Sequence, residues 1–560
     1  MPRLFFAVAA AAVADVSLSA QSATLEPQAP WFDGLGRHTR EISTDNDGAQ
    51  GYFDQGIAFL IAANPDEARR SFEEAARFDP HCAMAYWGIA MSEGPQLELP
   101  PPGANRELAA VAALNRAHEL ATKRALPVER DLIAALARRH ADPPPDARRP
   151  LDRAFAGAMH EVWKEYPQDP DVGAWYAAAV LQAAGRPRWT PEGLPDGPTA
   201  EVLETVQEVL KLAPRHPLAN RLAVLVLAGS PRADVADPHA RLLRDLAPGL
   251  GHFVYTSARI DARLGRWEAA LEATRDARAA DQRYLELGGI GPNRYRLTMG
   301  LHRLGVVHVA MMTGRSALAR QTAEELVSGL PPEWRQNHRR AADRLLALPL
   351  QVDLRFGRWN EILRRPLIAG EFPLSLSLQH AARGLACVAK EDLAGARREL
   401  ESIMSTAAPL SADPGVWAES AELIVAVAAH LLTGEILLHE NEPAAAITAF
   451  EYAVQAAEAL QGTHGTFWLL PPRHALGTAL MSTRDLPRAA EVFNADLEQW
   501  PENGWSLLGL SQVRQLQEDG AAAAALAQRL ARAWAHADGA VDRPWMPTAA
   551  PAEGQEVARK

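Results

Sequence analysis

The stretch "YFDQGIAFLIAANPDEARRSFEEAARFDP", residues 52–80, carries the pattern that decides the fold. Small Gly56 and Ala68 alternate with large Phe59 and Phe72 at spacings that place them on the facing sides of two consecutive helices. Pro80 then ends the second helix, because proline has no backbone N–H to donate. The stretch therefore predicts an antiparallel helix pair that meets closely through its small residues.

The same pattern returns near the C-terminus. Gly434 and Phe450 hold this spacing, and Gly477, Phe493 and Pro501 hold it again. A helix pair repeated about every 34 residues is the signature of the tetratricopeptide repeat (TPR). Runs of alternating β-branched residues bounded by hairpin turns do not occur. We therefore predict an all-α fold, a TPR-like α-solenoid: a superhelix of antiparallel helix pairs with about 20 to 24 helices.

The segment "HCAMAYWG", residues 81–88, follows the first repeat directly. Trp87 lies beside small residues, so we interpret it as a core filler, and Cys82 as a small buried residue. The second cysteine is Cys387. In a solenoid each repeat contacts mainly its neighbours, so the two cysteines should not form a disulfide.

The chain divides into five predicted segments. Residues 1–23 resemble an export signal, because Arg3 precedes a short apolar run that ends in small residues. An extended arm, 24–48, comes next, with Trp31 and Phe32 as anchors on the first helices. TPR-like helices fill 49–405, further TPR repeats fill 416–537, and 538–560 is a flexible tail. We expect a periplasmic or secreted protein without a transmembrane segment in the mature chain.

The charge balance limits the class of partner. The 560 residues carry a net charge of −12, whereas nucleic-acid binders usually present a basic stripe. We therefore expect no nucleic acid, and a protein or peptide partner that is basic or neutral. No phosphate-binding loop, dinucleotide fingerprint, HExxH or GxSxG motif occurs. Nothing in the pattern determines the oligomeric state.

Three runs of sequence are similar to a family of bacterial, often exported, TPR proteins. They are "AQGYFDQGI", "EARRSFEEAARFDPHCAMAYWGIAMSEGP" and "RHALGTAL…PENGWSLLGL". Members of this family usually carry runs such as "HPGAxHYYIHxxE", "GHLxHMPSHI" and "HNxHF". The resemblance implies a superhelix whose interior holds many His and Glu side chains, a set that suits a metal or acid–base site.

This chain keeps only part of that set. His216, His252 and His308 match histidines of the family pattern. Other histidine or glutamate positions are replaced, namely by Arg221, Leu225, Ala228, Tyr255, Arg259 and Gly305. Near the C-terminus Trp468 and Arg473 match, but His464 stands where the family has glutamate. If the family site is catalytic, this chain should be a weakened or inactive version.

Two sets of candidate site residues follow. The three retained histidines are candidate ligands of a transition metal if they converge, with His38, His302 and His464 as additions. Arginine repels a cation and does not ligate one, so a site filled by arginines would favour an anion. The candidate ligand-binding residues are Arg221, Tyr255, Arg259, Trp468 and Arg473.

Two functional hypotheses belong to different classes. The first is an exported, non-catalytic scaffold that binds a protein, a peptide or a small ligand on the concave face of the superhelix. The alternative is a metal-dependent enzyme, or an accessory subunit of one, with a histidine-based site inside the coil. The histidine replacements weaken the alternative.

Overall fold

The computed structural model describes residues 27–546, apart from 100–101, 145–146, 186, 191–192, 231, 290–293, 411–415, 461–467 and 540, and leaves the side chains of 416–419 undescribed. Within these residues the secondary structure is helical, and the one β-bridge joins Trp189 to Pro195. The all-α prediction is thus confirmed. The predicted export signal and His464 lie outside the described residues.

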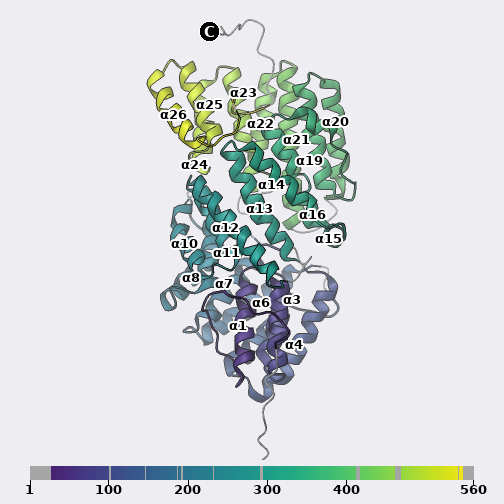
Figure 1. The fold of residues 1–560 in the computed structure, drawn as a ribbon, viewed down its shortest axis with the longest axis vertical. Helices are drawn as coiled ribbons and strands as arrows, with labels where there is room; N and C mark the ends of the chain where they lie inside the picture. The colour runs from purple at the N-terminus through teal and green to yellow at the C-terminus, as the bar shows by residue number, and fades with distance from the viewer. Residues whose placement is uncertain are drawn as a thin grey trace, which may run out of the picture.

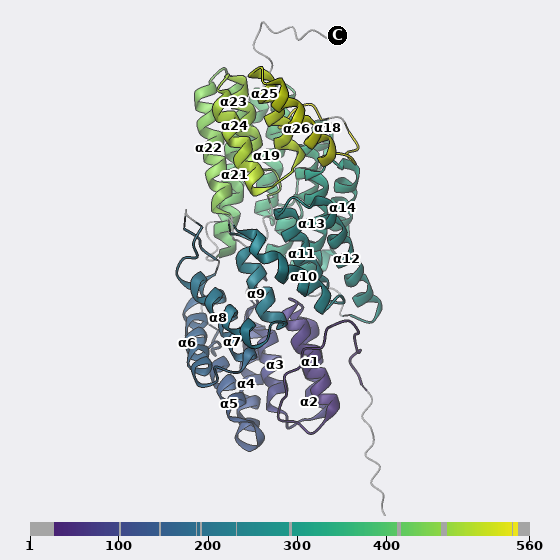
Figure 2. The same ribbon diagram turned by 90° about the vertical axis from the view of Figure 1, so that its left-hand side faces the viewer.

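The first eight helices stack at one end of an elongated molecule (Figures 1 and 2). Several begin at an Asn or Asp whose side chain accepts a backbone N–H, as Asn46, Asn64 and Asp169 do. The helices are α1 (Asp47–Ile61), α2 (Pro65–Phe78), α3 (Ala83–Glu93), α4 (Ala104–Arg124), α5 (Pro127–Ala137), α6 (Arg149–Glu165), α7 (Pro170–Ala184) and α8 (Pro198–Leu212).

The middle of the chain is less regular. Long helices α11 to α14 lead into four short ones, and this fragmentation raises the number of helices above the predicted range. The elements are α9 (Pro217–Leu227), the 3₁₀ helix η1 (Ala233–Ala236), α10 (Asp237–Leu246), α11 (Gly251–Arg263), α12 (Trp267–Glu286), α13 (Tyr295–Met312), α14 (Ser316–Ser328), α15 (Pro332–Asn337), α16 (Arg339–Leu345), α17 (Leu348–Arg355) and α18 (Trp359–Arg364).

The C-terminal helices form regular pairs at the other end, drawn green to yellow in Figure 1. Consecutive helices pack against each other, as in α19 with α20 and α21 with α22. The elements are α19 (Pro373–Ala389), α20 (Leu393–Ala407), η2 (Ala408–Leu410), α21 (Val416–His439), α22 (Pro443–Ala459), α23 (Pro472–Ser482), α24 (Leu486–Gln499), α25 (Gly504–Leu516) and α26 (Gly520–Ala533).

Glycines facing phenylalanine rings explain why the helix pairs approach so closely. A Cβ added at Gly56 would lie 2.6 Å from the Phe72 ring, and one at Gly88 would lie 2.4 Å from the same ring. Phe493 makes the same contact with Gly477, at 2.5 Å from an added Cβ. Any larger side chain would push the helices apart. Each phenylalanine thus fills a space that exists because its neighbour has no side chain.

Trp87 and the cysteines are buried. Trp87 is 2% exposed and packs edge-to-face on Trp175 at 6.0 Å. Cys82 and Cys387 are both buried and form no disulfide. Burial raises the pKa of the Cys82 thiol to about 11, so the group is neutral and unreactive at pH 7.

The two ends of the described chain pack onto the helices. In the arm, Phe32 is buried against Phe59 and Tyr284, whereas Trp31 is 57% exposed despite its edge contact with Tyr52. At the other end, Trp545 is 2% exposed, so the start of the segment predicted to be flexible is anchored. An aromatic residue in a Pro- and Gly-rich tail can bury enough area to order a short segment.

The predicted boundary between 405 and 416 lies inside one hydrophobic core. This core runs from Leu99 and Val254 to Trp545 and includes residues of α19 to α24, while another runs from Ala29 to Met299. Helices α19 and α20 both pack on α21. The change of core therefore falls in the middle of the chain, around α11 to α13.

Helix α21 also has membrane-like composition. Its stretch Ser420–His439 has a mean hydropathy of 1.8 and is long enough to cross a bilayer, and this is the one such helix among the described residues. The predictions made from the sequence did not include it. Within the protein 56% of the stretch is buried, since α19, α20, α22 and α23 pack around it. An inner helix of a helical stack has the same composition.

Candidate functional site

The three retained histidines lie in three different environments, so they do not share one metal ion. His216 contacts Asp171, His252 contacts Glu98, and His308 packs against two tryptophans. Within the described part of the chain, the one group of three potential ligands that lie close together contains His216 but neither of the other two.

His216 belongs to a cluster that fastens the N-terminal arm to α7 and α9. Nε2 of His216 and Nε2 of His38 lie 3.1 and 3.0 Å from the same oxygen of Asp171. Arg40 lies 3.2 Å from the other oxygen and also pairs with Asp169. Burial would raise the pKa of Asp171, but His216 and His38 outweigh it and lower that pKa. A carboxylate thus joins two imidazoles and a guanidinium.

The ligand atoms of His38, Asp171 and His216 lie within 4.8 Å of one another, a spacing that suits a metal ion. The hydrogen bonds of His216 favour a different use. Its Nδ1 accepts the backbone N–H of Ala219 at 3.2 Å and caps α9, so the proton of the neutral ring is on Nε2. Nε2 could ligate a metal only if that proton left and the cap were lost. The geometry is that of a hydrogen-bonded cluster that holds the N-terminal arm against α7 and α9.

A second cluster lies inside the coil around Glu98, in the loop between α3 and α4. One oxygen accepts from Arg221 at 2.7 Å and from Nε2 of His252 at 3.0 Å, and the other lies 3.2 Å from Arg259. Burial alone would raise the pKa of Glu98, but these three neighbours hold it well below its ordinary value. The two arginines predicted to bind an anion therefore already hold a carboxylate of the chain itself.

The histidines beside this cluster are neutral at pH 7 or bonded to acids. Burial lowers the pKa of His252 to about 4 although Glu98 opposes this. The His302 ring stacks on His252 at 5.8 Å, and its Nδ1 lies 2.7 Å from Asp281. Tyr255 packs on His302 at 5.0 Å. Nδ1 of His252 and Nε2 of His302 are buried and have no hydrogen-bond partner among the described residues.

The remaining candidates have structural contacts. His308 packs against Trp267 and Trp500, and burial lowers its pKa to about 4. Nε1 of Trp468 donates to the carbonyl of Leu470 at 2.6 Å. Arg473 donates to Gln499 at 3.0 Å and pairs with Glu458. Among the described residues, none of these groups lies beside another to form a common site.

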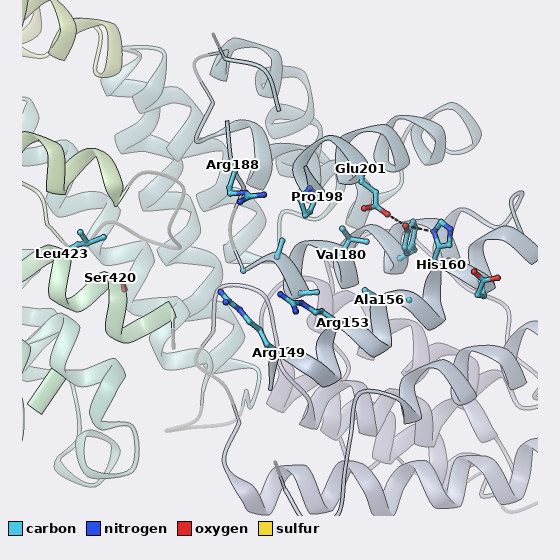
Figure 3. Close-up of a pocket in the computed structure, with 16 residues that line it drawn as sticks. Arg149, Arg153, Ala156, His160, Val180, Arg188, Pro198, Glu201, Ser420 and Leu423 are labelled. Carbon is cyan, nitrogen blue, oxygen red and sulfur yellow. Dashed lines mark hydrogen bonds between the residues drawn. The ribbon is translucent and has the colours of Figure 1, made fainter. Parts of the chain in front are cut away.

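A cavity of about 760 Å³, which the sequence did not predict, lies between the first stack and α21 (Figure 3). Arg149 and Arg153 on α6 line one side, and Arg188 comes from the loop between α7 and α8. Ser420 and Leu423 of α21 lie across the gap. The wall thus combines residues more than 200 positions apart, and single arginines carry no motif that could have revealed it.

The arginines of this cavity differ in their partners. Arg149 and Arg153 are exposed, and no described residue forms an ion pair with either. Arg188 lies 3.4 Å from Asp196 in an exposed pair, which contributes little. The neighbouring Arg148, by contrast, pairs with the buried carboxylate of Glu107. The cavity therefore presents positive charge that the described protein does not neutralise.

A hydrogen-bonded triad also lines the cavity, at the end away from α21 (Figure 3). The Tyr176 hydroxyl donates to Glu201, and Nδ1 of His160 lies 2.7 Å from the same hydroxyl. Since the hydroxyl proton is used on Glu201, Nδ1 of His160 must be the donor in the second bond. Burial, with Glu201 beside it, raises the pKa of Tyr176 and keeps the phenol neutral. This end offers acceptors, while the arginines offer donors.

Comparisons with known proteins find distant likeness only. No family model and no curated protein matches the chain. A chain of a human IFIT1 dimer with PPP-AAAA is 12% identical, with a TM-score of 0.34, over 85% of this chain and 88% of that one. A chain of the APC/C hetero-tetramer Cut9–Hcn1 is 13% identical, with a TM-score of 0.34, over 88% and 75%. Likeness at this level carries no argument about function, and the TPR-like class rests on the helix pairs themselves.

Proposed function

We propose that this protein is an exported TPR-like scaffold that binds a segment of a partner protein between its first helical stack and α21. One observation carries the proposal: the 760 Å³ cavity is lined by α6 to α8 together with Ser420 and Leu423 of α21, and it keeps charged side chains that no described residue pairs. Binding sites in repeat proteins commonly lie where the curvature of the coil brings separate repeats together. The proposal includes no catalytic step and no nucleic acid.

Export and membership of the bacterial TPR family belong to the same proposal. They are supported by the signal-like residues 1–23 and by the sequence resemblance that runs from about His38 to about Ala537. Fractionation of cells expressing the full chain should place the protein outside the cytoplasm, with a new N-terminus near residue 20 or 23. Recovery of the intact N-terminus from the cytoplasm would contradict export without touching the binding site.

Site-specific photo-crosslinking tests the binding role. A crosslinking amino acid at Ala156, inside the cavity, should capture one protein that mass spectrometry identifies, whereas the same residue at exposed Glu208 on α8 should not. The purified partner should then bind wild type and lose at least tenfold in affinity against Ala156→Trp, which fills the cavity. Equal capture at both positions, or unchanged affinity for Ala156→Trp, would refute the cavity as the binding site.

The metal-dependent alternative is the weaker proposal and has one supporting observation, the proximity of His38, Asp171 and His216. Asparagine is a good helix cap, so His216→Asn removes the ligand and keeps the cap. If the cluster binds zinc, loaded wild type should retain about one ion per chain, and His38→Gln and His216→Asn should retain none. Metal far below one ion per chain in loaded wild type would exclude this alternative.

A further inference from the structure

We propose that the cavity between α6–α8 and α21 is a carboxylate-binding site that takes an acidic peptide segment. This inference rests on the proposed scaffold function and goes further, because it names the chemistry of the bound segment. It reverses, for this one place, the expectation from net charge that the partner is basic or neutral.

The two arginines of α6 carry the argument. Arg149 and Arg153 are four residues apart, so they lie on the same face of the helix about one turn apart. Like charges at this spacing repel each other, and neither residue has an ion-pair partner among the described residues. Figure 3 shows both side chains directed into the gap toward α21. A bound anion would remove this repulsion and satisfy both guanidinium groups.

Arg188 is the third arginine of the cavity and adds to its positive charge. Arg188 enters the cavity from the loop between α7 and α8, and its weak pair with Asp196 leaves most of its donors available (Figure 3). Arginine forms two parallel hydrogen bonds with a carboxylate, which gives both charge neutralisation and a fixed orientation. Three arginines around one space therefore suit more than one carboxylate.

The rest of the lining favours a peptide over a phosphate-rich polymer. Glu161 and Glu201 also line the cavity, and they would repel a dense polyanion such as a nucleic acid. Val180 and Leu423 supply apolar area for aliphatic stems, and Glu201 can accept backbone N–H groups of a peptide.

Fluorescence anisotropy with a labelled hexaglutamate peptide tests the inference at low ionic strength. Wild-type protein should bind it, and Arg149→Gln/Arg153→Gln should bind at least tenfold more weakly. The control Arg130→Gln/Arg138→Gln removes the same charge from exposed arginines of α5 and its C-terminus and should change affinity less than twofold. Unlabelled hexaglutamate should compete, and uncharged hexaserine should not.

Three outcomes would overturn the inference. They are equal binding by wild type and the α6 double variant, equal weakening by the control variant, and tighter, arginine-dependent binding of a six-nucleotide oligomer or of inorganic phosphate. The partner captured through Ala156 separates this inference from the scaffold proposal. If the α6 double variant binds that partner as wild type does, the scaffold role stands and the carboxylate site is refuted.

Discussion

The C-terminal repeats and the interior around Glu98 are built on opposite principles. In α21 to α24, Gly434 faces Phe450 and Gly477 faces Phe493, and each contact is apolar and short in sequence. Around Glu98, a charged network joins residues 123, 154 and 161 positions apart. The first arrangement repeats because every helix pair needs it. The second occurs once, because it fixes the relative position of α3–α4, α9 and α11.

The apolar contact should have the largest effect on stability. Phe450→Ala removes a ring that is fully buried against Gly434 and leaves a cavity, so we expect a loss of about 4 kcal/mol in the free energy of unfolding. Tyr452→Ala, on the same helix but 51% exposed, should cost less than about 0.5 kcal/mol. Urea unfolding followed by circular dichroism measures both. Similar losses in the two variants would disprove the idea that phenylalanine rings packed against glycines stabilise the helix pairs.

The charged network around Glu98 should have the second-largest effect on stability. Glu98→Gln leaves the buried Arg221 and the partly exposed Arg259 without their carboxylate, so we expect a loss of about 3 kcal/mol in the free energy of unfolding. The exposed pair Glu119–Arg116 provides the matched control, and Glu119→Gln should cost about 0.3 kcal/mol.

The pH profile of the same variant sharpens this comparison. The pKa of Glu98 is lowered in the folded protein, so its stabilisation is present above its unfolded pKa and is lost as pH falls. The loss of stability on acidification should therefore be smaller in Glu98→Gln than in wild type. Parallel pH profiles would show that Glu98 does not act as a charge.

The pKa of Glu435 on α21 is shifted in the opposite direction to that of Glu98. Burial raises its pKa to about 8, although the indole N–H of Trp545 donates to it at 2.8 Å and opposes the rise. An acid with a raised pKa contributes stability below its unfolded pKa, and this contribution is lost as pH rises toward 8.

Removing this charge should stabilise the protein at high pH. Glu435→Gln keeps an acceptor for Trp545, so we expect a gain on the order of 2 kcal/mol at pH 8 and no gain at pH 4, measured by chemical unfolding. A variant that is no more stable than wild type at pH 8 would show that Glu435 is not buried against the tail.

These two regions also explain what the sequence could predict. The Gly and Phe spacing lies within one helix pair and returns in later pairs, so the sequence alone predicts the fold class. Glu98 stands in a Pro-rich loop, and nothing in "GPQLELPPPGAN" indicates that its side chain enters the coil between α9 and α11. Matching His216, His252 and His308 to a family pattern identified two buried positions and one half-buried position, yet spacing along the chain could not show that each has its own partner. The cavity arginines had no signal at all, because their role depends on which side chains the fold brings beside them.

The smallest expected effect has the opposite sign to the first two. Arg149 opens α6 and Arg153 follows one turn later, so both positive charges lie near the positive end of the helix dipole as well as near each other. Arg149→Gln/Arg153→Gln should therefore raise the free energy of unfolding by about 0.5 kcal/mol, while it weakens hexaglutamate binding at least tenfold. In the α5 control, Arg130→Gln removes a positive charge near the N-terminal end of the helix, and Arg138→Gln removes a favourable one at its C-terminal end. These two effects oppose each other, so the control should not stabilise the protein. Differential scanning calorimetry at low salt measures the difference, which should disappear in high salt. A destabilised α6 variant would mean that these arginines hold the fold together, and the case for a ligand in the cavity would lose its physical basis.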